Sequence, residues 1–213
     1  MRPPSPHPSL AAIALALLAA LIAIGLVSEA NAGPSRLSAL GAPVAPNDFR
    51  ISDMGPNGVA GAYPALPIVD LAYNPASDQY LVVWSGIDGA DGIERVYGQL
   101  IDARTGANVG PNDFLIGEGA SGADSRTPAA AYNAARNEFL VVWSDYGDTD
   151  AIYAQRVGAA GARSGGRLRI SGAVSGNPDV AYNSAADEYL VVWESEGAIY
   201  AQRLGFSGGS LVE

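Results

Sequence analysis

DLAYNPASDQYLVVW, at Asp70–Trp84, recurs as AAAYNAARNEFLVVW at Ala129–Trp143 and as DVAYNSAADEYLVVW at Asp179–Trp193. Each copy is followed by a shorter phrase, which reads VYGQL, IYAQR and IYAQR in the three copies. Self-similarity at a period of roughly 50 residues indicates a repeat architecture, in which each unit buries its apolar face against its neighbours. The repeats therefore decide the fold class before any single residue is considered.

Each repeat predicts four β-strands, because Gly and Pro punctuate apolar runs at strand-length intervals. In the first copy the strands are expected at Val69–Tyr73, Gln79–Ser85, Glu94–Asp102 and Asn112–Ile116. The corresponding strands are expected at Ala129–Tyr132, Glu138–Ser144, Ala151–Val157 and Arg167–Ser171, and then at Val180–Tyr182, Glu188–Glu194 and Ala198–Leu204. The Leu-Val-Val-Trp run of the second strand does not alternate, which is typical of a strand covered on both faces.

Four antiparallel strands in a repeat of this length predict an all-β fold made of β-propeller-type four-stranded blades. The chain holds about three repeats, and closed propellers usually need four to eight blades. The ring is therefore expected to be incomplete, to belong to a longer protein, or to be completed by an oligomer, with a homodimer of six blades as the simplest closed form. An open β-solenoid or a sandwich of repeats is the main alternative.

The segment Gly41–Ile51 matches the fourth-strand segment Gly106–Ile116, with Asn-Asp-Phe-x-Ile in both. It is an additional fourth strand without a repeat of its own. We expect it to pair with Ile199–Leu204, either of the same chain or of a partner. The last repeat is expected to stop while turning into its own fourth strand.

The Tyr-Leu-Val-Val-Trp and Ile-Tyr-Ala-Gln-Arg phrases resemble uncharacterised β-propeller-like repeats of secreted bacterial proteins, from about residue 37 to the end of the chain. The resemblance to kelch repeats is one of period only, because the Gly-Gly doublets are not followed by the kelch Tyr and Trp. The resemblance implies a fold and an exported location. It implies no activity, since propellers carry many functions.

The N-terminus has the layout of a secretory signal peptide. Leu10–Val27 is an apolar run that follows Arg2, and Ala30-Asn31-Ala32 is a small-x-small cleavage site. We expect a signal peptide over 1–32 and a repeat domain over 33–213, with blade parts 41–53, 68–117, 129–172 and 179–204. The predicted location is secreted, periplasmic or cell-surface in a bacterium, with no stable membrane span after cleavage. A retained N-terminal anchor is the alternative.

The composition excludes several kinds of chemistry from the mature chain. There is no cysteine and no lysine, all 12 basic residues are arginine, and the single histidine, His7, lies in the predicted signal peptide. Disulfides, thiolate metal sites, histidine bases and Schiff-base lysines are therefore excluded. A net charge of −10 opposes the phosphate backbone, so nucleic acid is not expected as a partner.

Five aspartates are candidate site residues. Asp70 and Asp179 begin equivalent first strands, where they would line a central channel and could contact a ligand; blade two has Ala129 there. Carboxylates near such a channel serve propeller glycosidases. Asp145, Asp148 and Asp150 share one loop and could bind Ca²⁺ through oxygen, although the loop does not match the EF-hand pattern. No cofactor is expected, and Ca²⁺ is the only metal that the sequence suggests.

The repeated aromatic residues are expected to be structural. The three tryptophans at the end of the second strand predict inter-blade core, and the Tyr-x-Gln pairs predict hydrogen-bonding positions: Trp84, Trp143 and Trp193, with Gln99, Gln155 and Gln202. Loop length varies after the second and the fourth strands, which meet at one rim of a meander. Loops on one face are where repeat proteins carry function.

These observations favour an exported, non-catalytic binding or interaction module with a protein or glycan ligand. Two alternatives stay open. One is an extracellular hydrolase that uses carboxylates, of the glycosidase kind, and the other is a purely structural surface protein.

Overall fold

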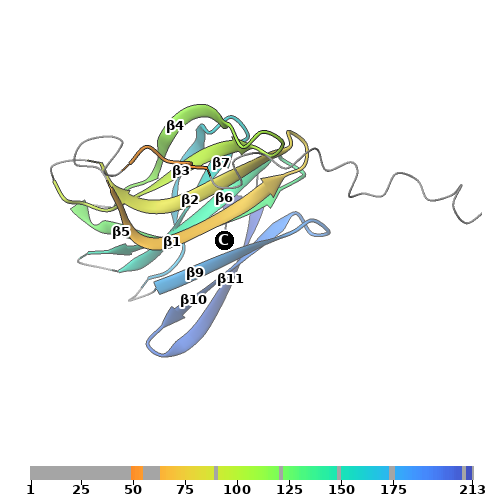
Figure 1. Ribbon diagram of the computed structural model, residues 1–213. Helices are drawn as coiled ribbons and strands as arrows, with labels where there is room; N and C mark the ends of the chain where they lie inside the picture. Colours follow the sequence, from red (N-terminus) through yellow and green to blue (C-terminus); the bar gives the residue numbers. More distant parts are fainter. Residues whose placement is uncertain are drawn as a thin grey trace, which may run out of the picture. The chain divides into compact units, whose positions relative to one another are not determined.

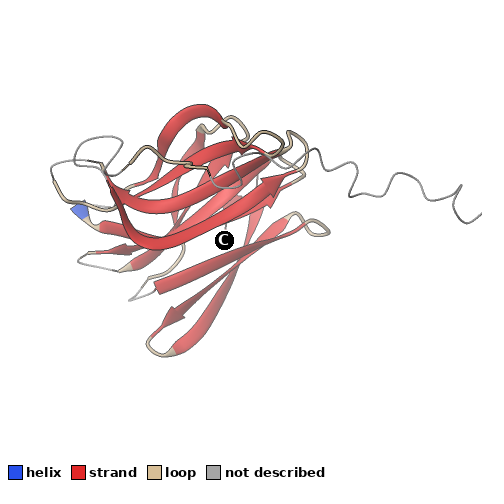
Figure 2. Ribbon diagram, viewed as in Figure 1, coloured by secondary structure: helices blue, strands red, loops and turns tan. Residues whose placement is uncertain are grey.

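The computed structural model of this chain describes residues 49–54, 63–88, 91–119, 122–147, 150–172, 176–207 and 210–212. All of them belong to the compact unit Ala45–Glu213. They form an all-β structure of three antiparallel sheets with four strands each (Figures 1 and 2). In this described part of the chain there is no helix long and apolar enough to cross a membrane.

Each sheet holds four strands that follow one another in the chain. The first sheet contains β1 (Tyr63–Asn74), β2 (Gln79–Ile87), β3 (Arg95–Asp102) and β4 (Asn108–Gly117). The second contains β5 (Asp124–Asn133), β6 (Glu138–Tyr146), β7 (Ala151–Gly158) and β8 (Arg163–Arg169). The third contains β9 (Gly176–Asn183), β10 (Glu188–Ser195), β11 (Ala198–Ser207) and β12 (Ser210–Val212).

The turn after the first strand of each sheet explains why the register repeats. Asn74 pairs with Gln79, and the equivalent pairs in the other sheets have the same spacing. The Asn74 side-chain oxygen accepts the backbone N–H of Ala76 at 2.9 Å, which closes an Asx turn. The last turn residue has a positive φ near +50° and is Asp or Asn, the types that tolerate this conformation: Asp78, Asn137 and Asp187.

The three sheets stack through the strands that begin them. β5 contacts β1 on one side and β9 on the other (Figure 1). One apolar cluster joins the first and second sheets and includes Leu81 and Trp143. Another joins the second and third sheets and includes Leu140 and Trp193. All three tryptophans are buried. The prediction that they form core between repeats is confirmed for Trp143 and Trp193, whereas Trp84 lies in a separate cluster with Met54 on the outer face of the first sheet.

The first strands are longer than the sequence suggested, because β-bulges hide their beginnings. β5 starts at Asp124 and not at Ala129, and its pairing with β6 is irregular between Arg126 and Ala129. Thr127, directly before Pro128, has a φ of +52°, and Asn177 before Pro178 has a φ of +51°. A bulged residue followed by proline interrupts the alternation of side chains between the two faces, by which a strand is recognised in a sequence. The strand nevertheless continues on both sides of the bulge.

The last repeat forms its fourth strand, contrary to expectation. β12 pairs with β11 through Gly205–Val212 and Phe206–Leu211. The prediction that the chain stops while still turning into this strand was therefore wrong. β12 is nevertheless short, with Ser210–Val212 as its described extent.

The described part of the N-terminal segment, residues 49–54, lies against the first sheet and not against β11 of its own chain. Pairing with Ile199–Leu204 of a partner stays a prediction, and residues 41–48 lie outside the described residues. Ser52 Oγ and the Asp53 N–H donate hydrogen bonds to Asp113 Oδ2 on β4, at 2.9 and 3.0 Å. Met54 is buried against Trp84, whose Nε1 donates to the Met54 sulfur at 3.5 Å. The segment thus covers apolar side chains on the outer face of the first sheet.

The stack is open, and the described strands do not close into a ring. The first sheet has one face that points away from the second sheet, and the third sheet also has one face that points away from the second sheet. The expectation of an incomplete ring is consistent with this arrangement.

Candidate functional site

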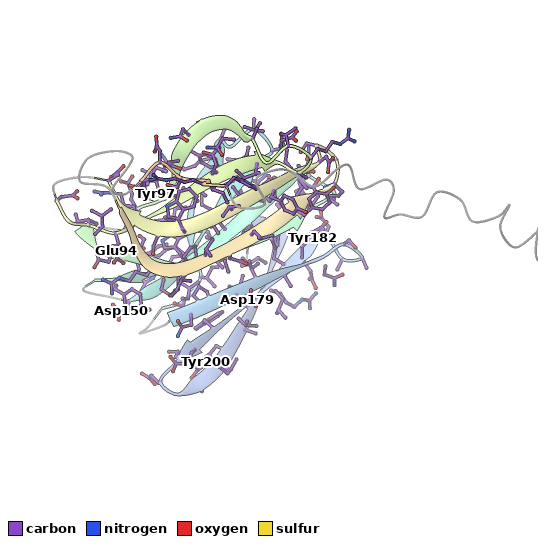
Figure 3. All side chains as sticks on the ribbon, in the orientation of Figure 1. Glu94, Tyr97, Asp150, Asp179, Tyr182 and Tyr200 are labelled. Atoms are coloured by element: carbon purple, nitrogen blue, oxygen red, sulfur yellow. The ribbon has the colours of Figure 1, made fainter. Side chains whose placement is uncertain are left out.

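The variable connections meet at one end of the sheets, as predicted from their lengths. Glu94, at the end of the β2–β3 connection, donates its N–H to Asp124 at the start of β5, at 3.0 Å. Its carbonyl accepts the Ser125 N–H at 2.8 Å, and its carboxylate pairs with Arg126. Figure 3 shows Glu94 and Asp150 toward the same side of the view.

Asp70 has a structural partner in the neighbouring sheet. Its Oδ2 accepts the backbone N–H of Ala130 on β5 at 2.8 Å. β5 begins its sheet and therefore has backbone groups on one edge that no strand of its own sheet pairs. The Asp70 carboxylate satisfies one of these N–H groups and links the first two sheets.

Asp179 occupies the equivalent position on β9 but lies on the exposed face of the third sheet (Figure 3). Its Oδ1 accepts the N–H of Val180 at 2.8 Å. β5 lies between the strands that carry Asp70 and Asp179, so the structure does not bring these two carboxylates together. Their predicted role as ligand contacts on a channel rim remains a prediction.

Asp145 is turned into the core and is buried. Its Oδ1 accepts hydrogen bonds from Ser125 Oγ at 2.6 Å and from Trp143 Nε1 at 2.7 Å, and Arg167 Nη1 lies 3.1 Å from Oδ2. All three donors are supplied by the protein itself, and the one from Arg167 is charge-assisted. It serves the packing of Trp143, and a calcium ion would have to displace these donors.

The other two loop aspartates give no further indication of a metal site. Asp150 Oδ1 accepts the N–H of Gly147 at 3.1 Å, and Asp148 lies outside the described residues. Among the residues that the structure describes, no group of three or more His, Cys, Asp or Glu side chains could hold a metal ion.

The predicted Tyr-x-Gln positions are structural in the first two sheets. Gln99 Nε2 donates to the carbonyls of Leu100 and Val109, and its Oε1 accepts the N–H of Asp113. Gln155 bridges β7 and β8 in the same way. Each glutamine thereby bridges the irregularity in the pairing of the third and fourth strands.

The tyrosine of the same phrase stacks on the tryptophan of the second strand in every repeat. The ring centroids of Trp84–Tyr97, Trp143–Tyr153 and Trp193–Tyr200 are 6.5, 6.3 and 6.2 Å apart. The first pair is covered, and burial raises the pKa of the Tyr97 hydroxyl far above its ordinary value. The second pair is covered by Arg167, whose guanidinium lies 4.1 Å from the centre of the Tyr153 ring.

The third pair is open. Tyr200 is 47% exposed, and it lines a hollow of about 270 Å³ together with Trp193, Ser171, Ser195 and Glu196. Tyr200 lies near the β10–β11 hairpin (Figure 3). In the second repeat the position of Ser195 is taken by Asp145, which holds Arg167 over the tyrosine; the serine cannot hold an arginine there by charge.

The hairpin that carries Glu196 turns in two residues, Glu196 and Gly197. Glu196 and Gly197 both have positive φ, at +53° and +78°, which is the pattern of a two-residue type I′ turn. The Gly197 N–H also donates to Glu194 Oε1 at 2.7 Å. The hollow therefore combines a stacked aromatic surface with hydroxyl groups and one carboxylate on this turn.

This arrangement can bind the flat face of a small ligand and hydrogen-bond its edge. Ligand pockets of small molecules usually measure about 300–1,000 Å³, so the hollow suits one small unit or the end of a chain. From the sequence, all three tryptophans were expected in the core, and this site was not predicted. The one available signal was the residue two positions after each tryptophan, which differs between the repeats: Gly86, Asp145 and Ser195.

Comparisons with known proteins identify no family. No protein-family model and no curated protein matches the sequence. Among solved structures, the chain is similar to the exo-β-1,3-galactanase from Phanerochaete chrysosporium. A variant of that enzyme with β-1,3-galactotriose gives 13% identity and a TM-score of 0.47 over 68% of this chain. The enzyme with galactose gives 15% identity and a TM-score of 0.43 over 66% of this chain.

The chain spans about a third of the length of these structures, 34% and 29% respectively. At this identity and this TM-score, the similarity gives no indication of activity.

Proposed function

We propose that this chain is an exported, non-catalytic binding module, built from three propeller-type blades, that binds a neutral sugar at the hollow beside Tyr200. The observation that carries the proposal is the open third Trp–Tyr pair, whose two counterparts in the described residues are covered by protein. A sugar ring has an apolar C–H face that packs on an aromatic ring, and hydroxyls that bond to serine and carboxylate groups.

The charge of the chain favours a neutral ligand. The net charge is −10, and Glu196 lies at the edge of the hollow. An anionic sugar would meet repulsion from both, whereas the Glu196 carboxylate can accept hydrogen bonds from two neighbouring hydroxyls of a neutral sugar.

Support for a non-catalytic role comes from the engagement of the carboxylates. Glycoside hydrolysis needs two carboxyl groups on either side of the scissile bond, roughly 5–10 Å apart. Asp70 and Asp145 are occupied by backbone and side-chain donors, and β5 separates Asp70 from Asp179. The hydrolase hypothesis would need a carboxylate pair other than these.

Support for export comes from the N-terminal sequence alone, since residues 1–32 lie outside the described part of the chain. The test is expression of the full chain in a bacterial host, followed by N-terminal sequencing of the protein from each fraction. A periplasmic or extracellular product that begins at Gly33 is expected. A product that keeps Met1 and stays in the membrane fraction would favour the anchor.

The binding site is tested with an array of neutral mono- to tetrasaccharides, followed by titration calorimetry with the strongest hit. Replacing Tyr200 with alanine removes the stacking surface, worth about 1–1.5 kcal/mol, so binding should weaken by roughly five- to tenfold. Tyr200→Phe should keep most of the affinity. Tyr80→Ala is the matched control, because Tyr80 is an exposed tyrosine of the first sheet and does not line the hollow.

Two results would contradict the proposal. One is a sugar that binds equally well to the wild type and to Tyr200→Ala, which would place the site elsewhere. The other is turnover of a nitrophenyl glycoside that is lost in Asp179→Asn, which would favour the hydrolase.

A further inference from the structure

Two outer faces of the stack expose apolar side chains. We call the face of the first sheet that points away from the second sheet the leading face, where Val69, Leu71 and Tyr73 are 61, 55 and 42% exposed. The trailing face is the face of the third sheet that points away from the second, where Leu190 and Ile199 are 43 and 76% exposed. Exposed apolar clusters of this kind mark sites of protein association.

The equivalent positions inside the chain are fully buried. Leu81 and Leu140 occupy the position of Leu190 in the first and second sheets, and both are 0% exposed. The residues at the position of Ile199 are Val96 and Ile152, and both are also 0% exposed. In these two sheets the following sheet covers the residue. The side chains of the trailing face are therefore of the kind that a following sheet buries.

The leading face shows the reverse relation. Ala130 and Val180 occupy the position of Leu71 in the second and third sheets, and each is buried against the sheet that precedes it. Within the chain, the face equivalent to the leading face packs twice on the face equivalent to the trailing face, once between the first and second sheets and once between the second and third.

Polar links accompany the apolar contact. Asp70 of the first sheet accepts the N–H of Ala130 of the second. Asn74 Nδ2 donates to Asn137 Oδ1 in the turn of the following sheet at 2.9 Å. Asn133 makes the same link from the second sheet to the third, to Asp187 Oδ1 at 3.3 Å.

The two outer faces carry residues at the positions of the acceptors and donors that form these polar links between sheets. Asp179, at the position of Asp70, and Asn183, at the position of Asn74, lie on the trailing face. Leu71 and Asp78, at the positions of Ala130 and Asn137, lie on the leading face, and Leu71 pairs with Val82 as Ala130 pairs with Val141. Within the described residues, Asp179 and Asn183 have no following sheet to contact.

We propose that a second copy of this chain docks its leading face on the trailing face, with the geometry that the sheets already have within one chain. Asp179 then accepts the N–H of Leu71 of the second copy, and Asn183 donates to Asp78 of the second copy. Leu190 and Ile199 become buried, as their counterparts are. The inference goes beyond the proposed sugar site, because Trp193 and Tyr200 lie on the opposite face of the third sheet.

The segment 49–54 is compatible with this contact. Gly117 on β4 packs on the Trp143 ring of the second sheet, where an added Cβ would lie 2.7 Å from the nearest ring atom. The short β12 offers no described residue at that position of the third sheet. Met54 instead covers Trp84, which leaves the inner strands of the leading face open to the second copy.

The contact joins a leading face to a trailing face, so two copies can cover both outer faces of each chain at once. A twofold axis through the centre of a six-sheet ring, outside either stack, would place each trailing face on the other copy's leading face. Rings of this size lie within the range that propellers use.

The test is sedimentation velocity of the full chain, expressed in an exporting host and weighed by intact-mass spectrometry. The wild type should sediment with twice its intact mass at micromolar concentration. Ile199→Arg and Leu71→Arg each put an unpaired charge into the contact and should weaken dimerisation at least tenfold. Ala160→Arg is the control, since Ala160 is exposed on the β7–β8 turn of the second sheet, away from both outer faces.

Mixing the two variants tests the direction of the contact. Each variant keeps one intact face, so an equimolar mixture should form a heterodimer through one wild-type contact, although each variant alone stays monomeric. Both substitutions are at exposed positions, and circular dichroism should show the same melting temperature for the monomeric variants.

Three results would overturn the proposal. They are a wild type that is monomeric at 100 micromolar, a dimer that resists both substitutions, and a dimer that Ile199→Arg breaks but Leu71→Arg does not. The last result would mean that two trailing faces meet.

Discussion

Replacing Gly117 with alanine should destabilise the protein through one close contact between sheets. A Cβ at Gly117 would lie 2.7–2.9 Å from three ring atoms of Trp143, well inside normal contact distance. The ring cannot move aside cheaply, because Trp143 is fully buried and its Nε1 donates to Asp145 at 2.7 Å. Overpacking of a core usually costs about 1–3 kcal/mol.

Two effects decide the net magnitude. Alanine has less conformational freedom than glycine in the unfolded chain, and this raises the free energy of unfolding by about 0.4–1 kcal/mol. The net loss in the free energy of unfolding should be about 1–2 kcal/mol. For a domain of this size, each kcal/mol shifts the melting temperature by about 2–4 °C, so a decrease of about 2–8 °C is expected.

Thermal unfolding followed by circular dichroism measures this decrease, with Gly166→Ala as the matched control. Gly166 also lies on a fourth strand, β8, and an added Cβ there has nothing within 4 Å. The control should melt at or slightly above the wild-type temperature. If Gly117→Ala melts as high as Gly166→Ala, the first sheet does not pack tightly on Trp143 at this position.

Two further predictions concern the first sheet. Met54→Ala should uncover Trp84, lower the stability by about 2 kcal/mol or more, and shift the tryptophan fluorescence to the red; an unchanged spectrum would mean that the segment does not cover this ring. Hydrogen bonds from Tyr73 and Arg104 lower the pKa of Asp78 below its ordinary value of 3.8. The ionised carboxylate therefore adds stability, which is fully present above pH 3.8 and is lost as the pH falls through the lowered pKa. Asp78→Asn should therefore be less stable than the wild type at neutral pH, and the difference should shrink in acid; a difference that does not change down to pH 2 would contradict this.

The outline of each sheet could be read from the chain because it depends on local chemistry. The Asx turn at Asn74, the positive-φ residue at Asp78 and the apolar run at Leu81–Trp84 lie within a few residues of one another. Each of them constrains the backbone without help from the rest of the molecule. Four-stranded sheets and buried tryptophans follow, and the structure confirms both.

The beginnings of β5 and β9 could not be read in the same way. Their bulges at Thr127 and Asn177 interrupt the alternation of side chains, and the strands continue only because β6 and β10 supply pairing partners beyond the bulge. Strand length at these positions is a property of the sheet.

The sequence by itself determined the repeat, the sheets and the absence of histidine, cysteine and lysine chemistry from residues 33–213. Tertiary structure decided what the repeated residues do. Asp70 reaches a backbone N–H of the next sheet, whereas the same residue type at Asp179 stays exposed. Three nearly identical Trp–Tyr pairs likewise become two covered pairs and one open one. The physical reason is that a repeat specifies the fold of its own strands, but the environment of a side chain depends on which neighbour covers it.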